Sequence, residues 1–186
     1  MIIASRSIAS IPCCNNKKSC SIKCNKIKAI IKTSKGDITI ELNPQSTPKT
    51  VENFIRYAKE GQYKDTIFHR VISNFMIQGG EYKADGSSKK PKHPPIKSES
   101  RSGLKNTKGT IAMARTNRPD SAKAQFFINT RNNPSLDRSD KKEGYTVFGT
   151  VTKGMDVVNK IRISKTNNKN WPEDSTTIYD VKIEQD

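Results

Sequence analysis

Apolar and polar side chains alternate along two short segments near the start of the chain, residues 27–32 and 38–42. A period of two places every second side chain on the same face of a strand. The residues between the segments (33–37, Thr-Ser-Lys-Gly-Asp) include a glycine and favour a turn. The pattern therefore predicts a β-hairpin.

Helical spacing replaces this alternation in two places. The first predicted helix begins after Thr47, a candidate N-cap, with Pro48 at the first helical position, and it ends at Gly61. Its apolar face comprises Val51, Phe54, Ile55 and Ala58. A second, shorter helix is predicted at residues 155–161, where Met155, Val158 and Ile161 share a face.

Six further runs have the composition of strands. They are residues 66–71, 75–79, 109–114, 125–129, 146–151 and 177–184. Two polar loops, residues 81–104 and 131–144, lie between them. Together these elements predict a mainly β fold. We expect about eight strands in a closed, antiparallel β-barrel capped by the two α-helices, because closure removes unpaired strand edges.

The charge is concentrated at the start of the chain. The 186 residues have a formal net charge of +16, and residues 1–36 contain eight basic residues and no acidic one. All cysteines lie in the same region (Cys13, Cys14, Cys20 and Cys24), and their spacing is not that of paired zinc ligands. We interpret them as free thiols in a basic, Ser/Cys-rich leader, residues 1–26, ahead of one folded domain, residues 27–186.

The leader has the composition of an organellar transit peptide, since it is basic and lacks the continuous apolar core of a secretory signal. A plastid or a mitochondrion is the expected destination. The alternative is an unprocessed, disordered extension on a cytoplasmic protein. Its charge can attract nucleic acid or anionic lipid, but it offers no aromatic residue for base stacking. We therefore do not expect specific nucleic-acid binding. No segment reaches the roughly 18 apolar residues of a membrane span, so we do not expect a membrane partner either.

The usual catalytic sets are absent from the sequence. The only histidines are His69 and His93, and every cysteine lies in the leader, so neither a Ser/His/Asp nor a Cys/His set can be assembled. There is no zinc-protease, P-loop or dinucleotide-binding motif. An enzyme built from these residues would need no nucleophile, general base, metal or cofactor.

Rotation about the X-Pro peptide bond meets that restriction. Amide resonance opposes it with a barrier of roughly 18–20 kcal/mol, while the cis and trans forms differ by only about 0.5–1 kcal/mol. A catalyst therefore needs an apolar pocket for the proline ring and a hydrogen-bond donor aimed at the proline nitrogen, which becomes a better acceptor as resonance is lost. Arg70 lies in an otherwise apolar run, residues 68–80, and an arginine there either reaches solvent or is used in a pocket, because burying it unpaired is costly.

Several blocks of the sequence resemble the signature of the cyclophilin-type peptidyl-prolyl cis-trans isomerases. They are residues 68–72 (FHRVI), 75–80 (FMIQGG), 109–115 (GTIAMAR), 124–129 (AQFFIN), 145–149 (YTVFG) and 154–158 (GMDVV). The blocks occur in order between about Lys28 and Ile183, and they are most similar to the compact, bacterial-type single-domain members.

The resemblance implies a role for particular residues. Arg70 matches the catalytic arginine and Gln78 the partner that orients it. Ala114 and the backbone of Arg115 match the strip that holds the residue before proline, and Gln125 matches a further polar contact. The walls of the proline pocket would come from Phe75, Met76, Phe127 and Leu136, with Tyr145 where many eukaryotic members have a histidine. We interpret His69 as a framework residue.

One departure affects inhibitor binding. Many eukaryotic members carry a tryptophan immediately before the pocket leucine, and it is the chief donor to cyclosporin; here that place is Ser135. We therefore expect weak cyclosporin binding.

The resemblance implies a peptidyl-prolyl cis-trans isomerase that assists protein folding. Its substrates would be flexible or unfolded proline-containing chains, and we expect a monomer. One alternative is a non-catalytic proline-binding or chaperone-like module on the same fold. Another is a nucleic-acid-associated protein that binds through the basic leader.

Overall fold

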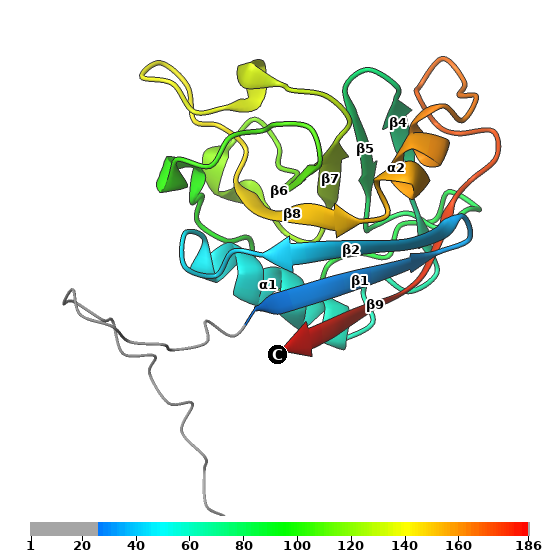
Figure 1. The fold of residues 1–186 in the computed structure, drawn as a ribbon, viewed down its shortest axis with the longest axis horizontal. Coiled ribbons are helices and arrows are strands. Elements are labelled where there is room, and N and C mark those ends of the chain that lie inside the picture. Colours follow the sequence, from blue (N-terminus) through cyan, green and yellow to red (C-terminus); the bar gives the residue numbers. More distant parts are fainter. Residues whose placement is uncertain (1–25, 186) are drawn as a thin grey trace, which may run out of the picture.

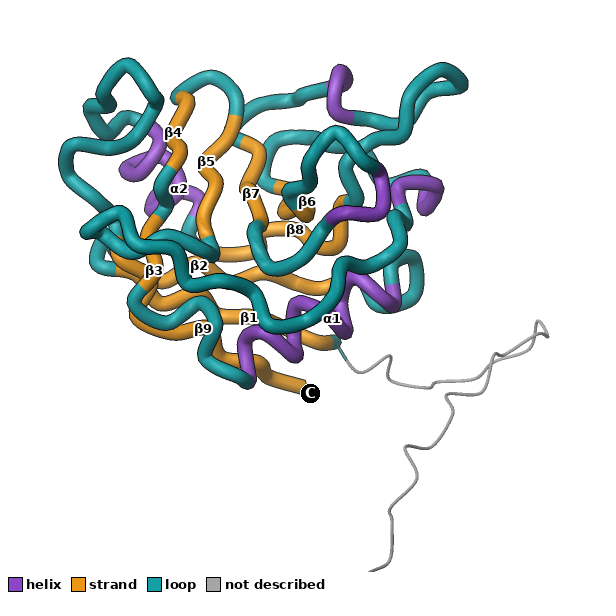
Figure 2. The backbone as a smooth tube through the Cα atoms, turned by 180° about the vertical axis from the view of Figure 1, so that it is seen from behind, coloured by secondary structure: helices purple, strands orange, loops and turns teal. Residues whose placement is uncertain are grey.

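The computed structural model describes residues 26–185 (Figures 1 and 2). The predictions for residues 1–25 of the leader, including those for its cysteines, lie outside these residues. Within residues 26–185 no helix is long and apolar enough to cross a membrane. The same part of the chain contains no group of three or more His, Cys, Asp or Glu side chains placed to hold a metal ion.

The fold is one antiparallel sheet with two α-helices, as the sequence pattern predicts. Its strands are β1 (Ile27–Thr33), β2 (Gly36–Leu42), β3 (Thr66–Ile67), β4 (Arg70–Ile72), β5 (Met76–Gly79), β6 (Thr110–Met113), β7 (Phe126–Asn129), β8 (Val147–Lys153) and β9 (Thr177–Gln185). The helices are α1 (Pro48–Lys59) and α2 (Met155–Arg162), and short 3-10 turns occur at Ser100–Ser102, Pro119–Ser121 and Pro134–Leu136. The strand order is β3-β9-β1-β2-β8-β6-β7-β5-β4.

The described residues form nine strands where about eight were expected, because one predicted strand is divided. Residues 66–71 were predicted as one strand, but Phe68 and His69 separate β3 from β4. β3 pairs with β9 and β4 pairs with β5, so the two edges of the sheet are consecutive pieces of the same run of chain. The sheet curves round until its edges meet in that run, and covalent continuity, not a hydrogen-bond ladder between β3 and β4, joins them (Figure 2).

The inner face of the curved sheet is filled by apolar side chains and covered by α1. Aromatic rings form its centre: Phe54 of α1 lies 5.1 Å from Phe148, 5.1 Å from Tyr63 and 5.8 Å from Phe126, measured between ring centroids. All four side chains are buried. The helix contributes Val51, Phe54 and Ala58 to this core, as its spacing predicts. α2 packs against β2, β4 and β5 (Figure 1) and contributes Val157, Val158 and Ile161 to the same core.

The start of α1 is capped differently from the prediction. Thr47 occupies the N-cap and Pro48 the first turn, but the Thr47 hydroxyl donates to the carbonyl of Asn43 and caps nothing. The cap comes from the Glu99 carboxylate, which accepts the backbone N–H of Lys49 at 3.1 Å and that of Thr50 at 2.9 Å. A carboxylate at a helix N-terminus satisfies free N–H groups and complements the helix dipole. The cap therefore ties the long 81–104 loop to α1.

Candidate active site

Strand register places three predicted site residues, Arg70, Gln78 and Phe127, in one row across the sheet. Arg70 of β4 is opposite Gln78 of β5, and Gln78 is opposite Phe127 of β7. Phe127 is opposite Ala112 of β6, which is opposite Val147 of β8. Directly opposed residues of antiparallel strands point to the same face. The row therefore runs across five strands on the face away from the aromatic core.

An apolar cluster separate from the main core is built on this row. Its buried members are Met76, Ala112, Phe127 and Val147. Its partly buried members are Ile72, Phe75, Leu104, Ala114, Leu136 and Tyr145. All five residues predicted as walls of a proline pocket, and Ala114, thus lie in one cluster that is partly open to solvent.

Four members of the cluster were not predicted: Ile72, Leu104, Ala112 and Val147. Three of them stand two residues from a predicted site residue, namely Ile72 after Arg70, Ala112 before Ala114 and Val147 after Tyr145. Because side chains repeat every second residue in a strand, this spacing is the sequence signal that identifies them. Leu104 lies in a loop and has no such signal.

Arg70 is exposed and makes no ion pair among the described residues. Its Nη1 donates to Gln78 Oε1 at 3.4 Å, and Gln78 Nε2 donates to Gln125 Oε1 at 2.6 Å. The guanidinium therefore reaches solvent beside the apolar cluster, with its charge unneutralised and its orientation guided by an amide. Arg70 thus both reaches solvent and lies beside a candidate pocket, the two placements that the sequence allowed.

The side chain of Arg115, for which no role was predicted, contacts the loop that carries Tyr145. Its guanidinium carbon lies 4.5 Å from the centroid of the Tyr145 ring, within the range of a cation–π contact. Its Nη2 donates to the carbonyl of Glu143 at 2.6 Å and its Nε to that of Gly144 at 3.3 Å. The side chain thus braces the loop that carries Tyr145, whose ring in turn packs edge-on against Phe127 at 5.6 Å.

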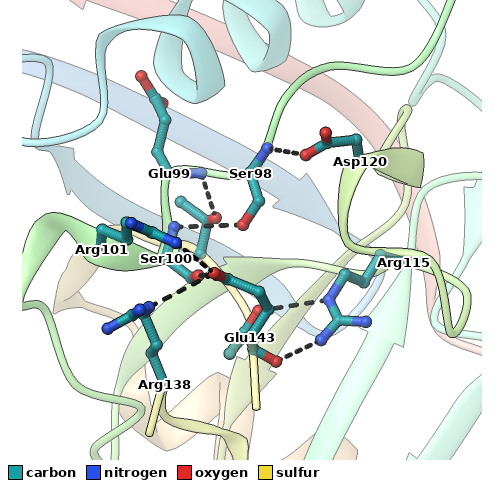
Figure 3. A network of polar contacts seen from close by, with 10 residues as sticks. Ser98, Glu99, Ser100, Arg101, Arg115, Asp120, Arg138 and Glu143 are labelled. Carbon is teal, nitrogen blue, oxygen red and sulfur yellow. Dashed lines mark hydrogen bonds and ion pairs between the residues drawn. The ribbon is translucent and has the colours of Figure 1, made fainter. Parts of the chain in front are cut away.

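A polar network continues from that loop to two others (Figure 3). The Glu143 carboxylate accepts a hydrogen bond from the Ser100 hydroxyl at 2.5 Å and is approached by Arg101 at 3.3 Å and Arg138 at 3.5 Å. The pKa of Glu143 is lowered, chiefly because the Ser100 hydroxyl donates to the ionised form. Nearby, the N–H of Ser98 donates to Asp120. These bonds join residues 98–101, 115–120 and 138–145, and no sequence pattern pointed to Glu143.

Buried asparagines hold the backbone of the cluster in place. The Nδ2 of Asn106 lies 3.3 Å from both the Leu136 and the Tyr145 carbonyls, while the Asp137 carboxylate accepts the Asn106 N–H at 2.7 Å. Asn106 also accepts a hydrogen bond from Asn129 at 3.2 Å.

The same network extends to the other wall of the cluster. Asn133 Nδ2 lies 2.8 Å from the Phe75 carbonyl and 2.7 Å from Asn129 Oδ1. Asn106, Asn129 and Asn133 are all at most 3% exposed. They therefore join, through buried hydrogen bonds, the backbone of three predicted wall residues that are up to 70 positions apart in the chain (Phe75, Leu136 and Tyr145).

His69 lies behind Arg70 and is buried against two other rings. Its ring centroid is 4.7 Å from that of Tyr82 and 6.0 Å from that of Trp171. Desolvation by burial lowers the pKa of His69 to about 4, and the neighbouring Arg70 charge acts in the same direction. His69 is therefore neutral near pH 7, which suits the framework role expected of it.

The chain matches the family model of the cyclophilin type peptidyl-prolyl cis-trans isomerases over residues 28–183. Peptidyl-prolyl cis-trans isomerase B of Escherichia coli is 52% identical over 133 residues, which cover 70% of this chain and 80% of the relative. Peptidyl-prolyl cis-trans isomerase A of Dickeya dadantii is 45% identical over 158 residues, or 83% of each chain.

Solved structures give the same result. A cyclophilin type peptidyl-prolyl cis-trans isomerase of Cryptosporidium parvum superposes with a TM-score of 0.73 at 27% identity, covering 87% of this chain and 99% of its own. A second structure of that protein, obtained in the presence of the dipeptide Ala-Pro, has a TM-score of 0.72 at 28% identity, covering 86% and 99%.

The asparagine network predicts a large effect of Asn106→Ala on stability. The change removes the buried amide that donates to the Leu136 and Tyr145 carbonyls and accepts from Asn129, so the free energy of unfolding should fall by about 1–3 kcal/mol. Urea unfolding measures it. Asn168→Ala, at an exposed position, is the control and should change it by less than about 0.5 kcal/mol. Equal effects of the two variants would contradict the structural role of Asn106.

The buried histidine predicts a loss of stability in acid. Below the ordinary histidine pKa of about 6.5 the unfolded chain binds a proton that folded His69 takes up only near pH 4. The free energy of unfolding should therefore fall as the pH drops from about 6.5 to 4, by up to about 3 kcal/mol from this group. Denaturation followed by circular dichroism at pH 7 and pH 4 should show a smaller drop for His69→Phe than for the wild type. The half-exposed His93→Gln should retain the full drop; equal drops in all three proteins would show that His69 contributes nothing.

Proposed function

The chain belongs to the cyclophilin-type peptidyl-prolyl cis-trans isomerases, and we propose which of its residues carry the reaction. Members of this family catalyse rotation about X-Pro peptide bonds, and the high identity over most of the chain makes this protein such an enzyme. The observation that carries the assignment of residues is the Arg70 guanidinium at the edge of the apolar cluster, which bonds Gln78 and has no ion-pair partner within residues 26–185.

Arg70 is the electrostatic catalyst in this proposal. As the amide twists, resonance is lost and the lone pair of the proline nitrogen becomes available to a donor. A guanidinium N–H aimed at that nitrogen binds the twisted state more tightly than either planar state, which lowers the barrier without a covalent intermediate. Its exposure and its freedom from any carboxylate among the described residues support this role, because an ion pair would compete with the substrate. Gln78 holds it in place at 3.4 Å.

The apolar cluster is the site for the proline ring. Phe75, Met76, Phe127, Leu136 and Tyr145 would surround the ring, and burial of its methylene groups gives about 0.8 kcal/mol for each. Ala114, half-buried at the border of the cluster, and the backbone of Arg115 would hold the residue before proline, with Gln125 close by. The N–H of Ala114 already bonds the carbonyl of Gln125, which supports a fixed strip at this edge.

The substrates of this family are proline-containing peptides. We propose that the clients are flexible or unfolded chains. The cluster lies on the outer face of the sheet and is partly open to solvent, so an extended segment can reach it. The structure of the Cryptosporidium parvum relative obtained in the presence of the dipeptide Ala-Pro supports proline-containing substrates. We further propose a monomer, and a leader (residues 1–26) that directs domain 27–186 to a plastid or mitochondrion and is removed there; N-terminal sequencing of the mature protein tests the leader.

The catalytic role of Arg70 is tested by Arg70→Ala in an isomerisation assay on an Ala-Pro peptide. Removing a donor that acts only in the transition state should lower kcat/KM by about 10²–10³-fold. Lys182→Ala, which removes an exposed cation from β9, should retain the wild-type rate. If Arg70→Ala isomerises the peptide as fast as wild type, the arginine mechanism is wrong, and a binding module on the same fold becomes the better reading if neither protein exceeds the uncatalysed rate.

Cyclosporin should inhibit this enzyme weakly. Ser135 stands in the exposed turn Pro134–Leu136, and it offers no indole N–H to the drug. Ser135→Trp should tighten the inhibition constant at least about tenfold, the worth of one additional hydrogen bond near 1.4 kcal/mol. Ser139→Trp, also exposed, is the control. Nanomolar inhibition of the wild type would contradict this prediction.

A further inference from the structure

The hydrogen bonds that begin at Arg70 continue beyond Gln125 to a carboxylate. Gln125 Nε2 donates to Glu81 Oε2 at 2.6 Å, and the Ser88 hydroxyl donates to Glu81 Oε1 at 2.9 Å. Glu81 lies two residues beyond the end of β5, the strand that carries Gln78, with Gly80 between. Arg70, Gln78, Gln125 and Glu81 thus form one line of side chains, with bond lengths of 3.4, 2.6 and 2.6 Å.

The chemistry of the two ends gives this line a direction. A guanidinium can only donate hydrogen bonds and an ionised carboxylate can only accept them, whereas an amide does one at each end. Glu81 requires the NH₂ of Gln125 to face it, so Gln125 presents its oxygen to Gln78. Gln78 must then donate to Gln125, which turns its own oxygen toward Arg70. No other arrangement of the two amides satisfies every bond.

We propose that Glu81 is a positioning residue for Arg70, acting through Gln125 and Gln78 by fixing which way both amides point. Without an obligate acceptor at position 81, the two amides can reverse together. Gln78 would then present its NH₂ to the guanidinium, two donors would face each other, and Arg70 would lose its anchor. The proposal rests on the catalytic role of Arg70 given above.

The two amides also keep the carboxylate away from the guanidinium. A direct Glu–Arg pair would neutralise the charge that the twisted substrate has to meet. Through the relay, Glu81 orients Arg70 and makes no ion pair with it. The Gln125 side chain is consequently occupied at both ends, so its predicted contact with the substrate is secondary to its place in the relay.

Glu81→Gln tests the direction of the relay at constant size, since glutamine at this position can offer either an oxygen or an NH₂. On an Ala-Pro peptide we expect kcat to fall about 3–10-fold with KM nearly unchanged, because the apolar cluster is untouched. The side-chain amide NMR signals of Gln78 should shift or double. Glu41→Gln, on β2, is the matched control and should leave rate and signals as in the wild type.

The double variant Glu81→Gln, Gln125→Glu separates direction from simple packing. A carboxylate at 125 accepts from Gln78 directly and from the amide at 81, so Gln78 again turns its oxygen to Arg70. The double variant should therefore recover much of the kcat lost in Glu81→Gln. A loss of kcat that the double variant does not recover would overturn the proposal, as would wild-type kcat and unshifted Gln78 signals in Glu81→Gln.

These outcomes are distinct from a failure of the proposed function. If Arg70→Ala is slow while Glu81→Gln is as fast as wild type, the arginine mechanism stands and the relay is wrong. Thermal unfolding of each variant by circular dichroism shows that the compared proteins are folded, and the NMR signals of Gln78 report the amide orientation independently of the rate.

Discussion

The site depends on three buried amides, those of Asn106, Asn129 and Asn133. Within residues 26–185 neither α-helix contributes to the apolar cluster on the outer face of the sheet, so the loops that complete the cluster are not held in place by a helix. The side-chain amides of the asparagines hold these loops by donating to their carbonyls. The three amides also bond one another, which satisfies buried polar groups. The wall residues can therefore remain partly exposed to a peptide and still be fixed.

The two faces of the sheet divide the work of the molecule. Ile77, Ile111 and Ile128 alternate with the site residues along their strands and point into the aromatic core under α1. Met76, Ala112 and Phe127 point the other way. Each strand thus contributes alternate side chains to the core and to the site. Because both sets share one backbone, packing of the core also fixes the positions of the site residues.

Local pattern was enough to predict the helices and nearly all of the strands, because these follow from helical and period-two spacing within a few residues, whereas the apolar members of the site were assigned through the resemblance. What the pattern could not give is the set of contacts between distant loops. The Glu99 cap lies 49 residues from Thr50, and Glu143 meets Ser100 across 43. Thr47 was assigned the cap on spacing alone, although tertiary contact decided it. The division of one predicted strand at Phe68 and His69 likewise reflects a bend of the barrel that no propensity records. Arg70 was singled out as a cation in an apolar run, which is ambiguous by itself, and the resemblance then assigned its role and that of Gln78.

The run Thr66–Ile72 has a consequence for biosynthesis. Among the described strands, β3, at the start of this run, pairs with β9 alone, and β9 is the last of them to be made. While the ribosome is still synthesising residues 177–185, β3 lacks its neighbour and the segment that carries Arg70 has one side unsecured. Non-local pairing of this kind is late and slow. We therefore expect a nascent copy of this enzyme to remain inactive until β9 has emerged from the ribosomal tunnel.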